Sequence, residues 1–330
     1  MPSRVARSTL TAVAMIAVAI SCGDTDALLA QDVRSRRVAP VLGQVTAARI
    51  VSAERALVLD ASEGRVHLVD AEGRSITSIG RKGSGPREFR APERIERLDN
   101  GSFGVLDRAN GRLTQLQVEG DSLRIVGERA MSPNLYALCR AGRTLLGAVR
   151  GDSAQQRVSV LRESLEVVRS FGSVHPDLPP PVRSRLAESR LGCISEQQVI
   201  AAEYLGPLVT SYSLSGEEQW RTSLPNHRSI RILATERGTR FEYPRAGHHG
   251  TLEVLPLSPD RVAISLQLVF LGPPADTATL RGTVYELDAR SGRVLSERTS
   301  PARLRDVAGA LRLYDYEDPE PRVAIRRGAP

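Results

Sequence analysis

The segment GRKGSGPREFRAP, residues 80–92, joins two copies of one repeating unit of short strands and turns. Each copy has an apolar strand that ends in aspartate, a Gly-Arg turn, a second strand, a glycine turn and a third strand. Corresponding residues are 47 positions apart, since Asp60, Gly64, Gly73 and Gly80 match Asp107, Gly111, Gly120 and Gly127. A repeat of this length is typical of a propeller, in which one four-stranded blade needs about 40 to 50 residues.

Residues 41–330 are long enough for about six such units. The sequence therefore predicts an all-β fold, a six-bladed β-propeller with four-stranded antiparallel blades. Later hairpins, with apolar positions alternating around glycine or serine turns, are expected within residues 156–172, 209–222 and 283–296. We expect residues 311–325 to complete the last blade with help from residues 41–50, which would close the ring.

The string G-x-x-G-x-G-P-x-E-F-x-x-P, followed by a Val-Leu-Asp strand, resembles the six-bladed NHL-type β-propellers of bacteria. Members of that family usually have another glycine after Gly-Pro, where this chain has Arg87. The segment is predicted to cross from one blade to the next, with positive φ permitted at Gly80, Gly83 and Gly85 and with Phe89 buried between the blades. It lacks the lysine and glycine pattern of a nucleotide-binding loop.

The amino terminus predicts export. Residues 1–21 begin with a basic stretch and continue with an uncharged apolar run that is shorter than the roughly 20 residues of a membrane-spanning helix, as in a secretory signal. Residues 19–22, Ala-Ile-Ser-Cys, resemble a lipoprotein signal, which implies lipidation of Cys22; ordinary cleavage after Ser21 is the alternative. Residues 22–40 indicate a flexible tether. We expect an extracytoplasmic protein, lipid-anchored to the cell membrane or outer membrane and facing the periplasm.

Cysteine usage is consistent with export. If Cys22 is lipidated, Cys139 and Cys193 remain, and an oxidising compartment would allow a disulfide between them. The sequence does not supply the separation of the two Cα atoms that a disulfide requires. Two buried free thiols are therefore the open alternative.

The positive net charge of +7 does not predict nucleic-acid binding. Lys82 is the only lysine, so the basicity is almost entirely arginine, and the arginines are scattered through every turn instead of forming one stripe. An exported protein would also rarely meet nucleic acid. We therefore expect no nucleic-acid partner.

The sequence contains no common catalytic motif. Gly-x-Ser-x-Gly and His-Glu-x-x-His are both absent, and the neighbouring residues His248 and His249 would point to opposite faces of a strand. Asp60, Asp70, Asp107 and Asp288 each end a strand and are expected to cap the following turn. Two long insertions, residues 175–187 and 224–250, are candidates for a functional role.

Two functions remain. The first is a non-catalytic binding module for a protein, peptide or glycan, without a cofactor, whose contact residues are predicted by their exposure and by their basic and aromatic character to be Arg81, Lys82, Arg87, Arg90, Tyr243, Arg245, His248 and His249. The alternative resembles the lactonase-type six-bladed propellers, which are metal-dependent. It would be a hydrolase or lyase with a divalent ion in the central channel, and its candidate ligands by residue type are Asp107, Glu203 and Glu286.

Overall fold

The structure is a computed structural model that describes residues 42–98, 101–150, 156–175, 177–236, 238–269, 282–316 and 321–328. The chain divides into residues 1–39 and residues 40–330, and all described residues belong to the second unit. The predicted signal (residues 1–21), the tether (residues 22–40) and Cys22 lie outside the described residues. No helix in the described part of the chain is both long and apolar enough to cross a membrane.

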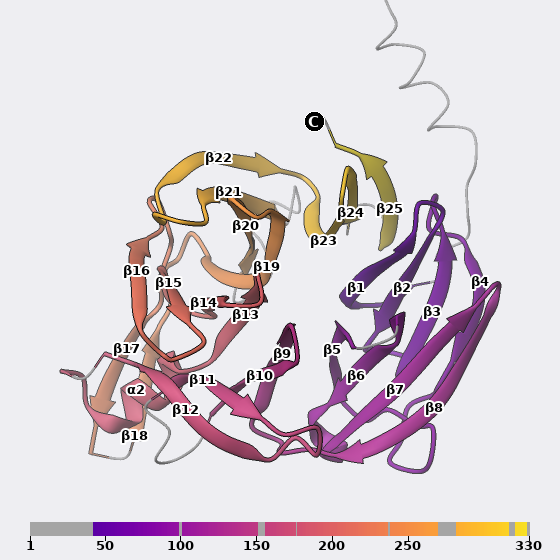
Figure 1. Ribbon diagram of the computed structural model, residues 1–330, viewed down its shortest axis with the longest axis horizontal. Coiled ribbons are helices and arrows are strands. Elements are labelled where there is room, and N and C mark those ends of the chain that lie inside the picture. Colours follow the sequence, from indigo (N-terminus) through magenta and orange to yellow (C-terminus); the bar gives the residue numbers. More distant parts are fainter. Residues whose placement is uncertain are drawn as a thin grey trace, which may run out of the picture. The chain divides into compact units, whose positions relative to one another are not determined.

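The described residues form six antiparallel blade sheets that follow one another along the chain, and one further two-stranded sheet (Figure 1). The first blade contains β1 (Val45–Ser52), β2 (Arg55–Asp60), β3 (Arg65–Asp70) and β4 (Ser75–Ile79). The second contains β5 (Pro92–Arg97), β6 (Phe103–Asp107), β7 (Arg112–Glu119) and β8 (Ser122–Ala130). The third contains β9 (Leu135–Ala141), β10 (Thr144–Val149), β11 (Gln156–Leu161) and β12 (Val167–Ser173).

The fourth blade contains β13 (Ser189–Cys193), β14 (Gln198–Glu203), β15 (Leu208–Ser213) and β16 (Glu218–Ser223). The fifth contains β19 (His248–Ser258), β20 (Arg261–Val269), β21 (Gly282–Asp288) and β22 (Val294–Ser300). The sixth has three strands among the described residues, namely β23 (Arg303–Ala308), β24 (Leu311–Tyr316) and β25 (Arg322–Arg327). A separate hairpin, β17 (Arg231–Thr235) and β18 (Gly238–Glu242), and a short helix, α2 (Pro180–Leu186), lie between blades in the sequence.

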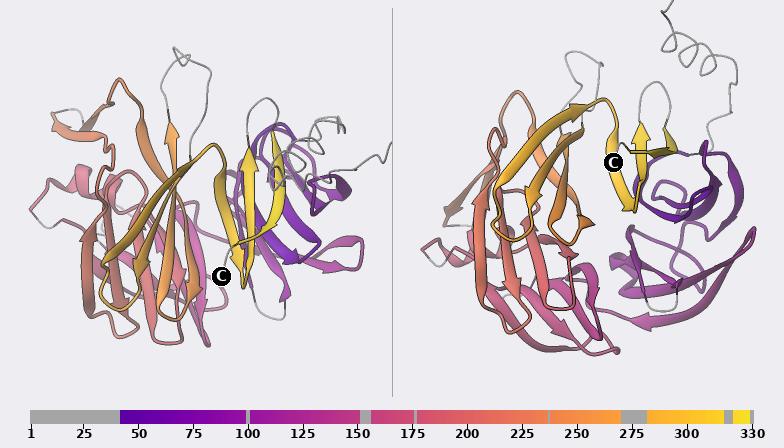
Figure 2. Two further views of the ribbon diagram at one scale, coloured as in Figure 1. Left: turned by 90° about the horizontal axis from the view of Figure 1, so that it is seen from above. Right: turned by 45° about the horizontal axis from the view of Figure 1, so that its top comes forward.

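The blades are arranged as a ring. The innermost strand of each blade contacts the innermost strand of the next, in the order β1, β5, β9, β13, β19 and β23, and β23 in turn contacts β1. Figure 2 shows the same arrangement from two further sides. The predicted six-bladed propeller is confirmed, as are the expected hairpins in the third, fourth and fifth blades.

The connector between the first two blades has the predicted role. Phe89 is fully buried in an apolar cluster made by both blades, and a Cβ on Gly80 would lie 2.5 Å from its ring. Gly80 and Gly83 have positive φ as predicted, whereas Gly85 does not. Arg87 has a φ of 60°, so this arginine takes the left-handed conformation at the position where the family usually has glycine.

The repeated aspartates cap turns, and two of them also hold the residues that precede the inner strand of their own blade. Asp60 accepts hydrogen bonds from the backbone N–H groups of Gly43 and Gln44, and Asp107 accepts them in the same way from Arg90 and Ala91. The four predicted turn caps are confirmed, because Asp60, Asp70, Asp107 and Asp288 each accept a backbone N–H two or three residues downstream.

The predicted way of closing the ring is wrong. Residues 45–52 form β1, the inner strand of the first blade, and do not extend the last sheet. The seam between the sixth and first blades is closed by an apolar cluster and by side chains, since Arg305 donates to the carbonyl oxygens of Val45 and Thr46. The outer edge of β25 meets the turn after β3, where the N–H of Ile325 donates to the carbonyl oxygen of Ala71 at 3.0 Å. This contact covers an otherwise open sheet edge.

Charged side chains cross the centre of the ring. The Oε2 atom of Glu253, on the fifth blade, accepts from Arg49 of the first blade at 3.0 Å and from Arg94 of the second at 2.6 Å. Glu96 bonds both arginines as well, at 2.9 and 3.1 Å. Because the second and fifth blades lie opposite each other in a six-bladed ring, the bond between Arg94 and Glu253 spans its axis.

Glu253 and Arg49 remain charged although they are buried. Burial alone would raise the pKa of Glu253, but the charges of Arg49 and Arg94 outweigh it and hold that pKa below its usual range. For Arg49, burial opposes the charged form, and Glu253 and Glu96 outweigh it to raise the pKa. Each of these two side chains therefore needs the opposite charge of the other to stay ionised in the buried centre.

Replacing Gly73 by alanine should weaken the seam. Gly73 has a φ of 86°, and a Cβ there would lie 2.3 Å from the carbonyl oxygen of Val323 in β25. Its counterpart in the second blade, Gly120, also has positive φ but has nothing within 4 Å of a Cβ. In urea unfolding we expect Gly120→Ala to cost about 1 kcal/mol and Gly73→Ala to cost about 2 kcal/mol or more. Equal losses would contradict this account of the seam.

Removing the charge of Glu253 should lower the free energy of unfolding more than removing the charge of an exposed ion pair does. Glu253→Gln leaves Arg49 and Arg94 with less compensation, so we expect a loss of about 3 to 5 kcal/mol in the free energy of unfolding. Glu72→Gln, at an exposed pair with Arg74, should cost less than about 1 kcal/mol.

Because the pKa of Glu253 is lower in the folded protein than in the unfolded chain, the stability that this carboxylate contributes is present above its unfolded pKa. That stability is lost as the pH falls through the folded pKa. Urea titrations at several pH values should show less acid sensitivity in Glu253→Gln.

Candidate functional site

The two insertions meet on one end of the ring. Helix α2 follows the outer strand β12, and the hairpin of β17 and β18 follows the outer strand β16. Both therefore lie at the end where inner strands begin, which we call the entrance face. The helix packs on the hairpin, and the guanidinium of Arg185 lies 5.6 Å from the centre of the Phe241 ring. The insertions thus form one joint addition to the entrance face.

Glu203 is the most unusual carboxylate on this face. It ends β14, as Asp60 ends β2 and Asp107 ends β6, but it does not hold the backbone of its own inner strand in the same way. Its Oε1 accepts from Arg157 of the third blade at 2.5 Å and pairs with Nε2 of His175 at 2.6 Å. Burial opposes the ionised form, but these hydrogen bonds and charges outweigh it and lower the pKa of Glu203. The carboxylate therefore joins the third and fourth blades.

His175 is held in an uncommon backbone conformation. Its φ is 36°, in the left-handed region that non-glycine residues rarely adopt. One quarter of its side chain, 26%, remains exposed while the ring bonds the buried Glu203. A constrained histidine that is both anchored and accessible is a common feature of functional sites.

Three further histidines gather at the start of the fifth blade. The rings of His227 and His249 are 5.2 Å apart, as are those of His248 and Tyr243. The Nδ1 of His249 accepts from the backbone N–H of Arg228 at 3.1 Å. Burial, with a smaller effect of His249, lowers the pKa of His227 to about 4. The His227 imidazole is therefore neutral near pH 7.

The predicted contact residues fall into two groups that the ring keeps apart. Arg81, Lys82, Arg87 and Arg90 are exposed on the connector between the first two blades. Tyr243, which is 42% exposed, and Arg245 lie between the fourth and fifth blades, on the opposite side of the ring. The expectation of exposure was wrong for His248 and His249, which are only 6% and 7% exposed; His248 packs on the Tyr243 ring and His249 on the His227 ring.

A stack of cations and aromatic rings extends the entrance face toward the second and third blades. The guanidinium of Arg108 lies 3.7 Å from the centre of the Tyr136 ring, and that of Arg150 lies 5.2 Å from it. On the neighbouring inner strand, Arg190 lies 4.5 Å from the Tyr204 ring. Sequence reasoning missed these residues, because they are scattered through three blades and form no local motif.

The candidate metal ligands do not come together. Asp107 caps its turn, Glu203 pairs with Arg157 and His175, and Glu286 forms an ion pair with Arg261 in the fifth blade. The bond between Arg94 and Glu253 also crosses the proposed channel. Each of the three carboxylates thus has another partner.

One other group in the described residues has metal-like spacing, with ligand atoms of Asp60, Glu63 and His67 within 4.8 Å of one another. Asp60 already accepts hydrogen bonds from four backbone N–H groups and from the Ser62 hydroxyl. Its carboxylate is therefore committed to closing the turn.

Cys139 and Cys193 form a disulfide in the structure, with Cα atoms 5.8 Å apart. The bond links the inner strands β9 and β13, and hence the third and fourth blades. These are the same two blades that Glu203 and Arg157 join at the entrance face. Of the two alternatives that the sequence left open, the structure contains the disulfide.

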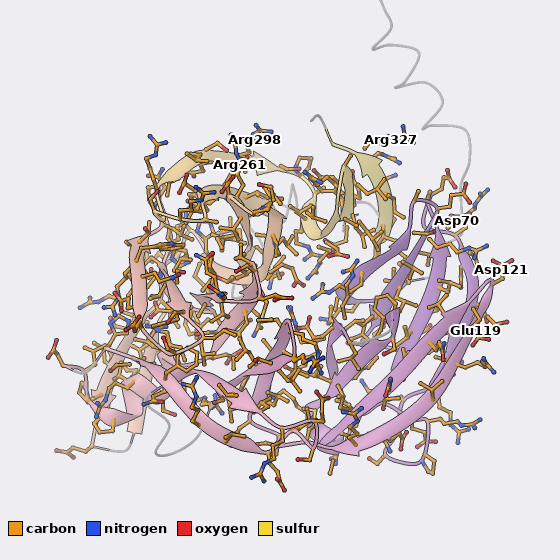
Figure 3. The ribbon with its side chains drawn as sticks, viewed as in Figure 1. Asp70, Glu119, Asp121, Arg261, Arg298 and Arg327 are labelled. Atoms are coloured by element: carbon orange, nitrogen blue, oxygen red, sulfur yellow. A yellow bond between two sulfur atoms is a disulfide. The ribbon has the colours of Figure 1, made fainter. Side chains whose placement is uncertain are left out.

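Charged side chains of both signs occupy the periphery. Figure 3 labels Asp70, Glu119 and Asp121 at the rim of the first two blades and Arg261, Arg298 and Arg327 on the last two. The labelled arginines thus lie on three different strands, β20, β22 and β25.

No protein-family model and no curated protein matches this chain. Among solved structures, it is similar to a Bacteroides fragilis protein described as a candidate exported protein, with a TM-score of 0.54 and 12% identity over 86% of this chain and 82% of that one. A member of the DUF4221 family from Bacteroides vulgatus gives a TM-score of 0.53 and 8% identity, covering 88% and 94% of the two chains. A streptogramin B lyase gives 0.45 and 9% identity, with coverage of 84% and 92%. The likeness to the two Bacteroides proteins shows the fold.

Because the pKa of His227 is low in the folded protein, the free energy of unfolding should decrease under mildly acidic conditions. Its folded pKa of about 4 lies below the ordinary value of about 6.5, so the unfolded chain binds the proton more readily. Stability is therefore full above about pH 6.5 and decreases as the pH falls toward 4. We expect His227→Gln to reduce this decrease in urea unfolding at pH 7 and pH 5. An imidazole resonance of His227 that titrates above pH 6 in NMR would contradict the assignment.

Proposed function

We propose that this protein is a membrane-tethered extracytoplasmic binding module of the NHL type, whose ligand is a protein, peptide or glycan. The observation that carries the proposal is the convergence of both insertions on the entrance face beside Glu203 and His175. Exposed loops and insertions on a rigid scaffold are where propellers and other folds carry binding residues. The predicted signal, Cys22 and the tether would place this face outside the cytoplasm.

The exposed part of the site has the chemistry of a recognition surface. Tyr243 offers a flat ring, Arg245 a cation and His175 a partly exposed imidazole, and the parts beneath them are buried and hydrogen-bonded. Aromatic and arginine side chains are the residues that most often dominate binding energy at interfaces. The first-blade connector, with Arg81, Lys82, Arg87 and Arg90, is a second contact area on the far side of the ring.

The arrangement supports binding better than metal-dependent hydrolysis. Glu203 offers one carboxylate whose oxygens are engaged by Arg157, His175 and the N–H of Leu208. A catalytic divalent ion needs several oxygen or nitrogen ligands together with an open position. The three candidate carboxylates instead have partners of their own, with Asp107 capping a turn, Glu203 bound to Arg157 and Glu286 paired with Arg261.

Site-specific crosslinking of the full chain in its membrane tests the proposal. A photoreactive phenylalanine analogue in place of Tyr243 should form an adduct with the ligand, detected by mass spectrometry. The same analogue in place of Val168, which is 55% exposed on the outer strand β12, should form none. Adducts at both positions, or at neither, would exclude the entrance face as the ligand site.

The same protein preparation decides between binding and metal chemistry. Elemental analysis of the purified chain should show less than one equivalent of bound metal. A stoichiometric metal that disappears in the Glu203→Gln variant would support the hydrolase or lyase instead.

A further inference from the structure

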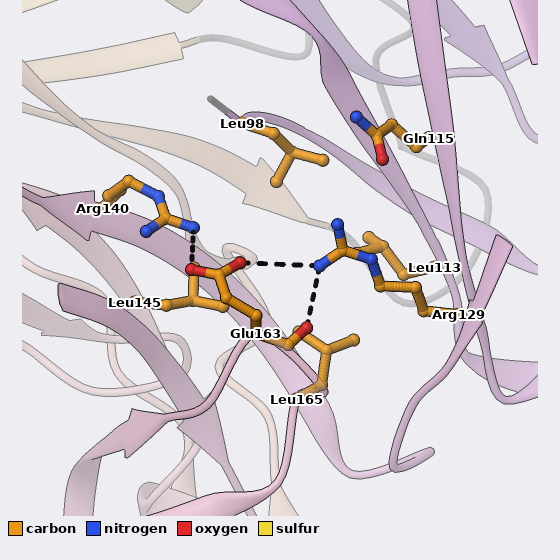
Figure 4. Close-up of a pocket in the computed structure, with 8 residues that line it drawn as sticks. All are labelled: Leu98, Leu113, Gln115, Arg129, Arg140, Leu145, Glu163 and Leu165. Carbon is orange, nitrogen blue, oxygen red and sulfur yellow. Dashed lines mark hydrogen bonds and ion pairs between the residues drawn. The ribbon is translucent and has the colours of Figure 1, made fainter. Parts of the chain in front are cut away.

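A separate pocket of about 170 Å³ lies between the second and third blades. Four leucines form apolar walls, with Leu98 and Leu113 from the second blade and Leu145 and Leu165 from the third (Figure 4). None of these residues belongs to the entrance-face site. The pocket is smaller than the roughly 300 to 1,000 Å³ of a typical drug-sized site, so any ligand must be small.

Two guanidinium groups converge on one carboxylate at this pocket. Nη2 of Arg140 lies 2.7 Å from Oε1 of Glu163, and Nη1 of Arg129 lies 3.6 Å from Oε2 (Figure 4). Nη1 of Arg129 also donates to the backbone carbonyl oxygen of Glu163 at 2.8 Å. Of the charged side chains that line the pocket, two are positive and one is negative.

Glu163 is attached to the pocket more loosely than the arginine beside it. Its side chain is 60% exposed on the turn between β11 and β12, whereas that of Arg140 is 16% exposed. Ion pairs with such exposure typically contribute only about 0 to 1 kcal/mol, because water competes for both charges. The Glu163 carboxylate can thus leave its partners at little cost.

We propose that this pocket binds a short-chain monocarboxylate. The ligand carboxylate replaces that of Glu163 between Arg129 and Arg140, and its aliphatic tail packs against the four leucines. A guanidinium group binds a carboxylate through parallel N–H···O bonds, and the apolar walls favour a tail without polar groups. Glu163 acts as an internal competitor that occupies the anion position when no ligand is present.

Isothermal titration calorimetry of the full chain with hexanoate tests this proposal. Wild-type protein should bind hexanoate, and Glu163→Gln should bind it about three- to fivefold more tightly because the internal competitor has lost its charge. Glu163→Gln combined with Arg129→Gln should lose this gain. The control variant is Glu166→Gln, since Glu166 pairs with Arg162 just beyond the same turn and does not line the pocket. It should match the wild type.

The controls separate a ligand site from a structural ion pair between blades. Hexanol and hexylammonium have the same tail without the anion and should not bind. Failure of wild-type protein to bind hexanoate at millimolar concentration would overturn the proposal, as would weaker binding by Glu163→Gln or equal binding of hexanol. Thermal unfolding of each variant shows whether it is folded, and the wild-type titration decides the question even if a variant unfolds. The outcome of this titration does not depend on the outcome of crosslinking at Tyr243, so the pocket proposal and the entrance-face proposal can fail separately.

Discussion

The hydrogen bond between Arg94 and Glu253 constrains the whole molecule, because it connects two opposite blades through the middle of the ring. Arg49 and Glu96 complete the same network, and Arg49 also donates to the backbone of the sixth blade at Arg305. These charges are buried, so each depends on its partners to remain ionised. Side chains of the first, second and fifth blades thus meet at the centre of the ring.

The repeat in the sequence predicted the fold because its signals are local. Asp60 and Asp107 occupy equivalent turns, and Phe89 is buried where the connector crosses between blades. Closure of the ring was not predictable in this way. The apolar pattern of residues 41–50 suits any inner strand, and only the contacts of Arg305 and Ile325 show how the last blade is attached.

The candidate site was predictable only in part. Glu203 could have been recognised as the acidic residue that ends a second strand, because Asp60 and Asp107 occupy the same place in the repeat. Its partners Arg157 and His175 are 46 and 28 residues away in the sequence and belong to different elements, so no spacing pattern connects them. His248 and His249 were expected at the surface, but neighbouring residues on a strand give no indication that an insertion covers both.

The disulfide between Cys139 and Cys193 fastens the joint that lies diametrically across from the seam between the sixth and first blades. The ring is thus held by a covalent bond at one joint between blades and by non-covalent contacts at the joint opposite. Glu203, Arg157 and His175 join the same two blades at the other end of β13, where Ser189 pairs with Glu203 and Cys193 with Val199, so the disulfide and this cluster hold one joint at two levels.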